Sequence, residues 1–253
     1  MTINVVNTGT TSNLIFNDTG QMQWTLSPTP SATNALIIPW HQESCGDLVV
    51  RSCTLSDNQG NTYQSITGGS NATGQGGFGA INCGIFYCPS IAVSGGNVIL
   101  TLAATGFTVH NEGTWTANHI EVSGLATSST LDQNGTATSG SSFLTNITCS
   151  ASGANTSAND LVVAAYVGFG PGNQFFGPSA PITGYTEITN VVIDSNSLTL
   201  SNESAYKIVS SLETSSANWT QGHSDTQLMA AVIATFKQAS GGPTMISSSW
   251  YKC

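Results

Sequence analysis

The chain has 253 residues, of which 7% are charged, and its thirteen acidic residues outnumber its four Lys and Arg residues for a formal net charge of −9. Ordinary soluble domains contain about 25% charged residues, so the polar surface here must consist mainly of Ser, Thr, Asn, Gln and Gly. So few cations cannot neutralise a phosphate backbone or bind an anionic membrane. The composition therefore excludes nucleic acid and membranes as partners, and the length suffices for one large β-sandwich or barrel.

Residues 1–33 are rich in Ser, Thr, Asn, Gly and Pro, and they predict an N-terminal arm. Such a segment offers little apolar area to offset the roughly 1–2 kcal/mol of backbone entropy lost per ordered residue. We expect it to make few contacts with its own core and to be ordered by neighbouring chains. The alternative is an edge strand through Ile3–Val6. The start at Met1 lacks the basic and apolar regions of a signal peptide, which indicates either a removed leader or release with virus particles.

From residue 34 onward, short β-branched runs alternate with clusters of turn-forming residues, a pattern typical of sandwiches and barrels. We therefore predict an all-β, antiparallel, two-sheet β-sandwich over residues 34–238, with a C-terminal tail at 239–253. Strands are expected near residues 34–39, 47–55, 62–66, 80–88, 97–103, 118–123, 142–150, 160–167, 184–189, 191–200, 205–212 and 227–236.

The clearest of these strands also predict the core. Met229–Phe236 is apolar on both faces, which indicates a central strand, although periodicity alone leaves a short buried helix open. In the other clear strands, alternate positions should point inward. The residues expected to be buried are Leu48, Val50, Ile85, Leu100, Leu102, Val122, Leu161, Val163 and Val232.

Two local patterns concern turns and repetition. Asp57–Asn61 supplies turn-capping side chains and a Gly between two strand-like runs, so it predicts a hairpin, and the Gly-rich segment 67–79 predicts a loop. Gly46–Val50 resembles Asn159–Val163, and Asn61–Ile66 faintly resembles Thr183–Ile188. We interpret this similarity as a sign that the two sheets of one sandwich use the same kind of residues at the points where their strands begin.

The order of strands and turns resembles a jelly-roll-like β-sandwich module found in bacteriophage structural proteins and in secreted bacterial surface proteins. The resemblance covers roughly residues 34–238, and it is carried by strand and turn patterns, so it implies a fold more than a function. The segments that carry it are Gly46–Val50, Asp57–Tyr63, Ile85–Tyr87, Asn97–Leu102, Ile120–Leu125, Asn159–Val163 and Met229–Ala234.

The six cysteines are too sparse for a disulfide scaffold, and we favour buried thiols over disulfides. If the run 81–88 is a strand, Cys83 and Cys88 lie on opposite faces and cannot pair with each other. The sequence contains no CxxC pair, so it gives no support for a zinc site. The cysteines are Cys45, Cys53, Cys83, Cys88, Cys149 and Cys253.

No pattern in the sequence predicts catalysis. There is no G-x-S-x-G elbow, and His110, His119 and His223 lack an HExxH motif or a nearby carboxylate cluster, so no metal site is predicted from them. A glycosidase needs only two carboxylates at a suitable separation, which sequence cannot forbid. The glutamates that could supply such a pair are Glu43, Glu112, Glu121 and Glu187. We nevertheless predict a non-catalytic protein without a cofactor.

Two kinds of ligand remain conceivable. Asp57, Asn58 and Asn61 offer hard oxygen ligands for a structural calcium ion, although a plain turn is the favoured interpretation. Aromatic side chains that we expect to be exposed at strand ends and in loops could stack on sugars, pack beneath loops or anchor a protein interface. The candidates are Trp40, Trp115, Trp219, Phe175 and Phe176.

Together these features indicate a protein that presents surface to partners. Our first hypothesis is a structural protein of a virion surface, such as a bacteriophage capsid decoration or fibre-associated protein, bound to neighbouring capsid subunits or to copies of itself. The alternative is a secreted bacterial carbohydrate-binding or adhesin module with glycans as partners. Either protein would act as a homo-oligomer or bound to a lattice.

Overall fold

The computed structural model describes residues 2–15, 20–44, 52–72, 80–104, 113–140, 142, 144–171, 182–195, 198–221 and 228–240. These residues form fifteen strands and no helix, and every strand pairing is antiparallel, so the predicted all-β fold is confirmed. None of this part of the chain forms a helix of the length and apolarity needed to cross a membrane. The strands are β1 (Asn4–Ile15), β2 (Gln21–Thr25), β3 (Ala35–Ser44), β4 (Cys53–Asp57), β5 (Gln64–Ala72), β6 (Ala80–Cys88), β7 (Ile99–Ala104), β8 (Gly113–Ser123), β9 (Leu131–Thr138), β10 (Asn146–Ser150), β11 (Leu161–Pro171), β12 (Thr186–Ser195), β13 (Leu198–Ile208), β14 (Ser216–Thr220) and β15 (Leu228–Phe236).

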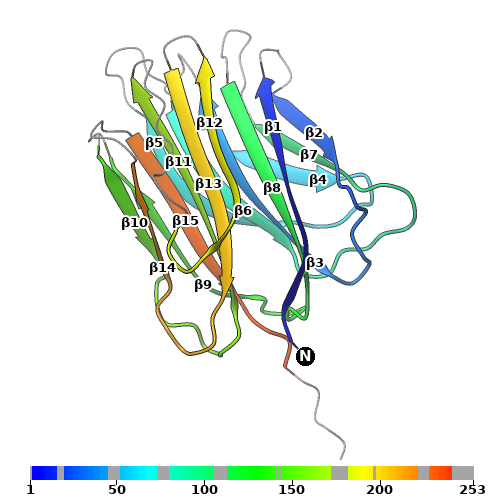
Figure 1. Cartoon of the computed structure of the whole chain (residues 1–253). Helices are drawn as coiled ribbons and strands as arrows, with labels where there is room; N and C mark the ends of the chain where they lie inside the picture. The colour runs from blue at the N-terminus through cyan, green and yellow to red at the C-terminus, as the bar shows by residue number, and fades with distance from the viewer. Residues whose placement is uncertain are drawn as a thin grey trace, which may run out of the picture.

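Four sheets contain these strands. The first large sheet, called sheet A, has the order β1-β8-β3-β6-β5, and the second, called sheet D, has the order β12-β13-β11-β15-β9. A small sheet B has the order β2-β7-β4, and a small sheet F pairs β10 with β14. In Figure 1, sheet B lies on one side of the molecule and sheet F on the other, with the long strands between them.

Three hydrophobic clusters fill the spaces between these four layers. The central cluster joins the inner faces of sheets A and D, for example through Ile37 and Ile85 of sheet A and Val163 and Val232 of sheet D. A second cluster lies between sheets A and B, and a third lies between sheets D and F. Both faces of each large sheet are therefore covered, which explains why β6 and β15 are buried at every position. The two small outer sheets were not predicted.

The two halves of the chain repeat one topology. Reading sheet D from its other edge gives β9-β15-β11-β13-β12, which matches β1-β8-β3-β6-β5 strand for strand, and β10 and β14 match β2 and β7. Thr33 and Asn159 occupy the same position, two residues before β3 and β11, and both have positive φ, at 74° and 66°. We call residues 2–125 repeat 1 and residues 126–240 repeat 2. Among the described residues, repeat 2 has no counterpart of β4.

The two repeats pack like the subunits of a two-fold dimer. Because the large sheets are stacked in opposite orders, β8 of repeat 1 faces β13, while β6 faces β15, the counterpart of β8. The central strands β3 and β11 face each other. Each strand of one repeat thus faces the same strand in the other repeat as its counterpart faces in return, which is the pattern of a self-complementary two-fold contact.

The N-terminal segment belongs to the core, so the expectation of few contacts is wrong for its described residues. β1 pairs with β8 from Asn4 to Ile15, which is the edge-strand alternative extended over a much longer segment. β2 pairs with β7, and Met22 and Leu26 are fully buried. The alternation of polar and apolar residues in β2 places Met22 and Trp24 on one face, where they cover sheet A. At the other end of the chain, Ala239 N donates to Gly124 O, and the rest of the predicted tail, residues 241–253, lies outside the described part.

Several predicted boundaries are also wrong. The three strands expected near 184–189, 191–200 and 205–212 are two longer strands, β12 and β13, because buried polar residues at 201–204 interrupt the apolar pattern within β13. Asp57–Asn61 is a turn but not a hairpin, since it connects β4 in sheet B to β5 in sheet A. Residues 67–72 of the predicted loop continue β5 through an irregularity between Thr67 and Ser70.

The core prediction is confirmed where it can be checked. Ile85, Leu100, Leu102, Val122, Leu161, Val163 and Val232 are all fully buried, and Leu48 and Val50 lie outside the described residues. The predicted central strand at Met229–Phe236 is β15, inside sheet D. Of the two sequence echoes, the one at Tyr63 and Tyr185 marks equivalent positions, just before β5 and β12. The other echo compares Asn159–Val163 with Gly46–Val50. Asn159–Val163 leads into β11, and the counterpart of β11 in repeat 1 is β3. Gly46–Val50 follows β3 in the chain and lies outside the described part.

Candidate functional site

A pocket opens on the outer face of sheet A, beside sheet B. It has a volume of about 130 Å³, and its lining comes from β3, β5 and β6 together with the start of β4. A buried water needs roughly 10–15 Å³ by a comparable measure, so the pocket has room for several waters or one small polar molecule. The lining residues are Trp40, Ser52, Cys53, Ser65, Thr67, Ser70 and Asn82.

Trp40 and Gly84 shape the floor of this pocket. They face each other across the β3–β6 pairing, and the indole lies so close to Gly84 that a Cβ there would approach Trp40 Nε1 to 2.8 Å. Phe86 stacks against the same indole with ring centroids 6.0 Å apart. The indole is thus fixed by packing, and the missing side chain at Gly84 makes space for it.

The polar groups of the floor and the rim differ in exposure. Ser65, Thr67 and Ser70 on β5 are exposed, whereas Trp40 is only 4% exposed. Trp40 Nε1 has no hydrogen-bond partner among the described residues, and neither has Gln42 Nε2, which lies two residues further along the same face of β3. A buried donor without a partner costs roughly 1–3 kcal/mol. Of these two residues, Trp40 is part of the described pocket lining and Gln42 is not.

The other aromatic candidates do not form a sugar platform. Trp115 is fully buried between sheets A and B, and Trp219 is 1% exposed and stacks on Tyr166 at a centroid distance of 5.5 Å. The expectation that these tryptophans lie exposed is wrong, because each fills the space beneath a small outer sheet. Phe175 and Phe176 lie outside the described residues.

The three candidate carboxylates that the structure describes lie on different strands. Glu43 lies on β3, Glu121 on β8 and Glu187 on β12, and Glu112 is outside the described part. Glu121 Oε1 accepts hydrogen bonds from Ser31 N (2.8 Å) and Asn34 Nδ2 (2.6 Å), which hold the turn before β3. Burial raises the pKa of Glu43 to about 7, so this acid is largely protonated at lower pH.

A buried polar seam crosses the interface between sheets A and D. Asn118 Nδ2 donates to Ser204 Oγ (2.9 Å), which is 3.3 Å from His41 Nε2, and Asn202 Nδ2 donates to Thr116 Oγ1 (3.3 Å). Burial lowers the pKa of His41 to about 3, against the opposing effect of backbone groups of Glu203 and Thr116. A neutral imidazole held between the repeats is a structural arrangement.

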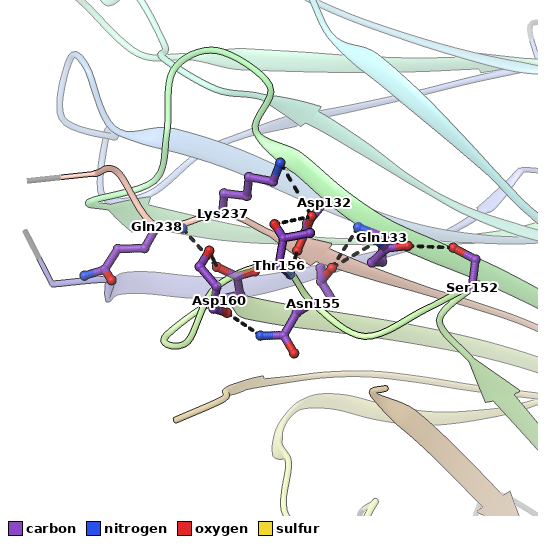
Figure 2. Close-up of polar contacts among 10 residues, drawn as sticks. Asp132, Gln133, Ser152, Asn155, Thr156, Asp160, Lys237 and Gln238 are labelled. Carbon is purple, nitrogen blue, oxygen red and sulfur yellow. Dashed lines mark hydrogen bonds and ion pairs between the residues drawn. The ribbon is translucent and has the colours of Figure 1, made fainter. Parts of the chain in front are cut away.

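A second polar cluster, missed by the sequence analysis, joins the start of β11 to the end of β15. Figure 2 shows Thr156 bonded to Asp132, whose carboxylate also lies 3.5 Å from Lys237 Nζ. Asp160 Oδ1 accepts a hydrogen bond from Gln238 N (3.3 Å). Burial and the neighbouring Asp132 raise the pKa of Asp160 to about 6. Because these bonds fasten a loop and the departing chain to repeat 2, we assign the cluster a structural role.

The weak calcium candidates form a turn. Asp57 Oδ1 accepts from Gln59 N (2.9 Å) and Asn61 N (3.0 Å), while Oδ2 accepts from Asn61 Nδ2 and Tyr63 Oη, each at 2.8 Å. Asn58 Nδ2 donates to Asn97 O across to the segment before β7. Both carboxylate oxygens are therefore used within the protein. Within the described ranges, no three His, Cys, Asp or Glu side chains form a group that could hold a metal ion.

The described cysteines are free thiols, as favoured. Cys83 and Cys149 are fully buried, and Cys83 faces the inner cluster while Cys88 lies on the opposite face of β6. Burial raises the pKa of both Cys53 and Cys149 to about 12, so these thiols stay protonated. Cys45 and Cys253 lie outside the described residues.

Of the aromatic candidates that the structure describes, Trp40 alone lines the pocket. Its companions on β5 and β6 carry no local signal, because they meet Trp40 only through pairing between distant strands. His119, also considered as a ligand, lies on β8 with its Nε2 3.3 Å from Asn7 Nδ2, and His110 and His223 fall outside the described part. Comparisons with protein-family models, with curated proteins and with solved structures found no match, so the site is interpreted from its own geometry.

Proposed function

We propose that this protein is a non-catalytic structural and binding protein of a virion surface, in the role of a capsid decoration or fibre-associated protein. The observation that carries the proposal is the chemistry of its two outer faces. The exposed side of sheet F bears only Ser, Thr and Asn, and the exposed side of sheet B bears Gln, Thr and Ser with Ile99 and Ala103. The residues of the sheet F face are Asn146, Thr148, Ser150, Ser216, Asn218 and Thr220.

These faces are regular as well as uncharged. On sheet F, Thr148 lies opposite Asn218 and donates to its Oδ1 at 2.9 Å. On sheet B, Gln23 Nε2 donates to Thr101 Oγ1 at 3.0 Å. Side chains that bond to each other across a ladder keep a fixed pattern of hydroxyl and amide groups, which a neighbouring subunit can meet with matching groups.

Electrostatics favours contact through these faces. The chain carries a net charge of −9, so copies of it repel each other through most other surfaces. The centres of protein interfaces are depleted of charged residues, and neutral polar groups cost far less to desolvate than ions do. An uncharged face on each side of the molecule therefore supports contact with a subunit on either side.

The test is to locate the protein in its source and then perturb the faces. Cryo-electron microscopy and antibody labelling of particles from the source should place the chain on a regular surface. The double variant Thr148→Glu with Asn218→Glu should abolish reassociation of the purified protein with stripped particles. The pair Thr54→Glu with Ser56→Glu applies the same change to sheet B and shows whether that face is used too. A chain found only free in solution would contradict the proposal.

A further inference from the structure

The pocket beside Trp40 has no occupant from the described chain and no role in the proposed assembly, which uses the outward faces of sheets B and F. Its floor is buried and its rim is exposed, so a ligand can enter from the β5 side. From this geometry we propose that the pocket binds an uncharged, hydroxyl-rich ligand of the size of one neutral sugar residue. The proposal does not rest on the proposed function, because the two use different side chains.

The first argument is the pair of buried donors. Trp40 Nε1 and Gln42 Nε2 have no partner in the described part of the chain, and they lie on the same face of β3. Gln42 Oε1 already accepts from the Cys53 thiol, at 3.7 Å, which fixes the amide with its donor end free. Trp40 also lines the pocket, and in the proposal its indole N–H donates to a hydroxyl oxygen of the ligand.

The second argument is the absence of charge. The seven described lining residues are all uncharged, and the Cys53 thiol stays neutral because burial raises its pKa to about 12. Hydroxyl groups line the rim at Ser65, Thr67 and Ser70. Each can both donate and accept, as a sugar hydroxyl can, whereas a ligand carrying a charge would lose hydration without meeting an opposite charge. The carbon edge of the indole completes a lining in which apolar and polar groups are mixed.

The third argument is the contrast with repeat 2. Tyr166 is the counterpart of Trp40, and Glu203, which lies opposite Tyr166, is the counterpart of Gly84. Glu203 is fully buried, and its Oε1 accepts from Ile182 N at 3.3 Å. A side chain of the protein therefore occupies, in repeat 2, the position that Gly84 leaves without a side chain in repeat 1. In repeat 1 the Trp40 indole takes the space over Gly84, so the two repeats fill this position differently and only repeat 1 places an indole there.

The experiment follows the indole N–H of Trp40 directly. In ¹H–¹⁵N spectra of the full chain, each of the five tryptophans gives one indole signal, and Trp40→Phe identifies that of Trp40. Free glucose, galactose, mannose and N-acetylglucosamine are titrated, with glucuronate and glucosamine as charged probes. We expect saturable movement of the Trp40 signal with at least one neutral sugar and none with the charged probes. The same sugars on immobilised oligosaccharides show whether a free sugar or a glycan end is preferred.

Two variants test the site itself. Gly84→Ala introduces a Cβ that must displace the indole, and it should weaken binding by at least tenfold, while Gly153→Ala, where the new Cβ would lie 3.4 Å from Gln133, should have no effect. If Gly84→Ala fails to fold, Ser65→Ala with Thr67→Ala should weaken binding by about fivefold for each lost hydrogen bond. The control for this double variant is Thr54→Ala with Ser56→Ala, which removes two hydroxyls from the outward face of β4, away from the pocket.

Three results would overturn the proposal. They are a Trp40 signal that no neutral sugar moves, equal movement by the charged probes, and undiminished binding in both pocket variants. None of these results bears on particle binding through sheets B and F, so a failure of this proposal is distinguishable from a failure of the proposed function.

Discussion

Replacing His41 with Gln should reduce the acid sensitivity of this fold. The imidazole is fully buried in the seam between the repeats, and burial lowers its pKa from 6.5 to about 3. Between these values the unfolded chain binds a proton that the folded chain does not bind. The contribution of His41 to stability is therefore present above pH 6.5 and is lost as the pH falls toward 3.

The magnitude follows from the two pKa values. At 1.36 kcal/mol per pH unit, lowering the pH from 7 to 4 should cost the wild type about 3 kcal/mol through His41 alone. Urea unfolding at pH 7, 6, 5 and 4 measures this loss, and the decisive quantity is the loss in the wild type minus the loss in His41→Gln. Ser204→Ala is the matched control, because it removes a partner of the imidazole but keeps the imidazole buried. Equal losses in the wild type and in His41→Gln would refute the reasoning.

Three further predictions concern stability. Leu100→Ala should lower the free energy of unfolding by about 2–5 kcal/mol in urea titrations, because it empties a fully buried site between sheets A and B. Burial raises the pKa of Glu203 to about 7, so its contribution is present below pH 4.5 and lost as the pH rises through 7. Glu203→Gln should consequently lose less stability than the wild type between pH 5 and 9, by about 3 kcal/mol at most in chemical denaturation. Asp57→Ala should lower stability by roughly 1–3 kcal/mol in thermal unfolding, since it leaves turn donors unpaired; an unchanged melting temperature would show that the turn holds without the carboxylate.

The strands that sequence predicted best are those buried on both faces. β6 and β15 are continuous apolar runs, and such runs are typical of strands inside a covered sheet. The strands of the small outer sheets have a different sequence pattern. In Gln21–Thr25 and Ser216–Thr220, polar and apolar residues alternate, and the structure shows the matching alternation of exposure. That alternation predicts half-buried strands, whereas the composition of residues 1–33 as a whole predicts an arm.

The pocket could be predicted only in part, for a physical reason. Trp40 was identified as an aromatic side chain at a strand end, yet it was expected to be exposed and is buried. What makes it a site is Gly84, which lies opposite it on β6, together with the hydroxyls of β5. These residues are separated along the chain and meet only through the register of paired strands. Register depends on the whole sheet, so no local pattern reveals which glycine faces which tryptophan.

The polar seam explains why the two repeats pair with each other rather than with copies of themselves. In repeat 1, β8 presents Thr116 and Asn118 to the interface, while β6 presents Cys83 and Ile85. In the molecule, β8 meets polar residues of β13, and β6 meets apolar residues of β15.

A symmetric pair of two copies of repeat 1 would instead place β8 against β6. Asn118 and Thr116 would then face apolar side chains, and each buried polar group left unpaired costs about 1–3 kcal/mol. A pair of two copies of repeat 2 would meet the same conflict at Asn202 and Ser204 against β15. In a symmetric pair, each unpaired polar group would occur twice, once on each side of the two-fold axis. A few buried polar residues therefore suffice to make the pairing of repeat 1 with repeat 2 more stable than the pairing of identical repeats. The duplicated fold thus derives its single arrangement from the asymmetry of its central core.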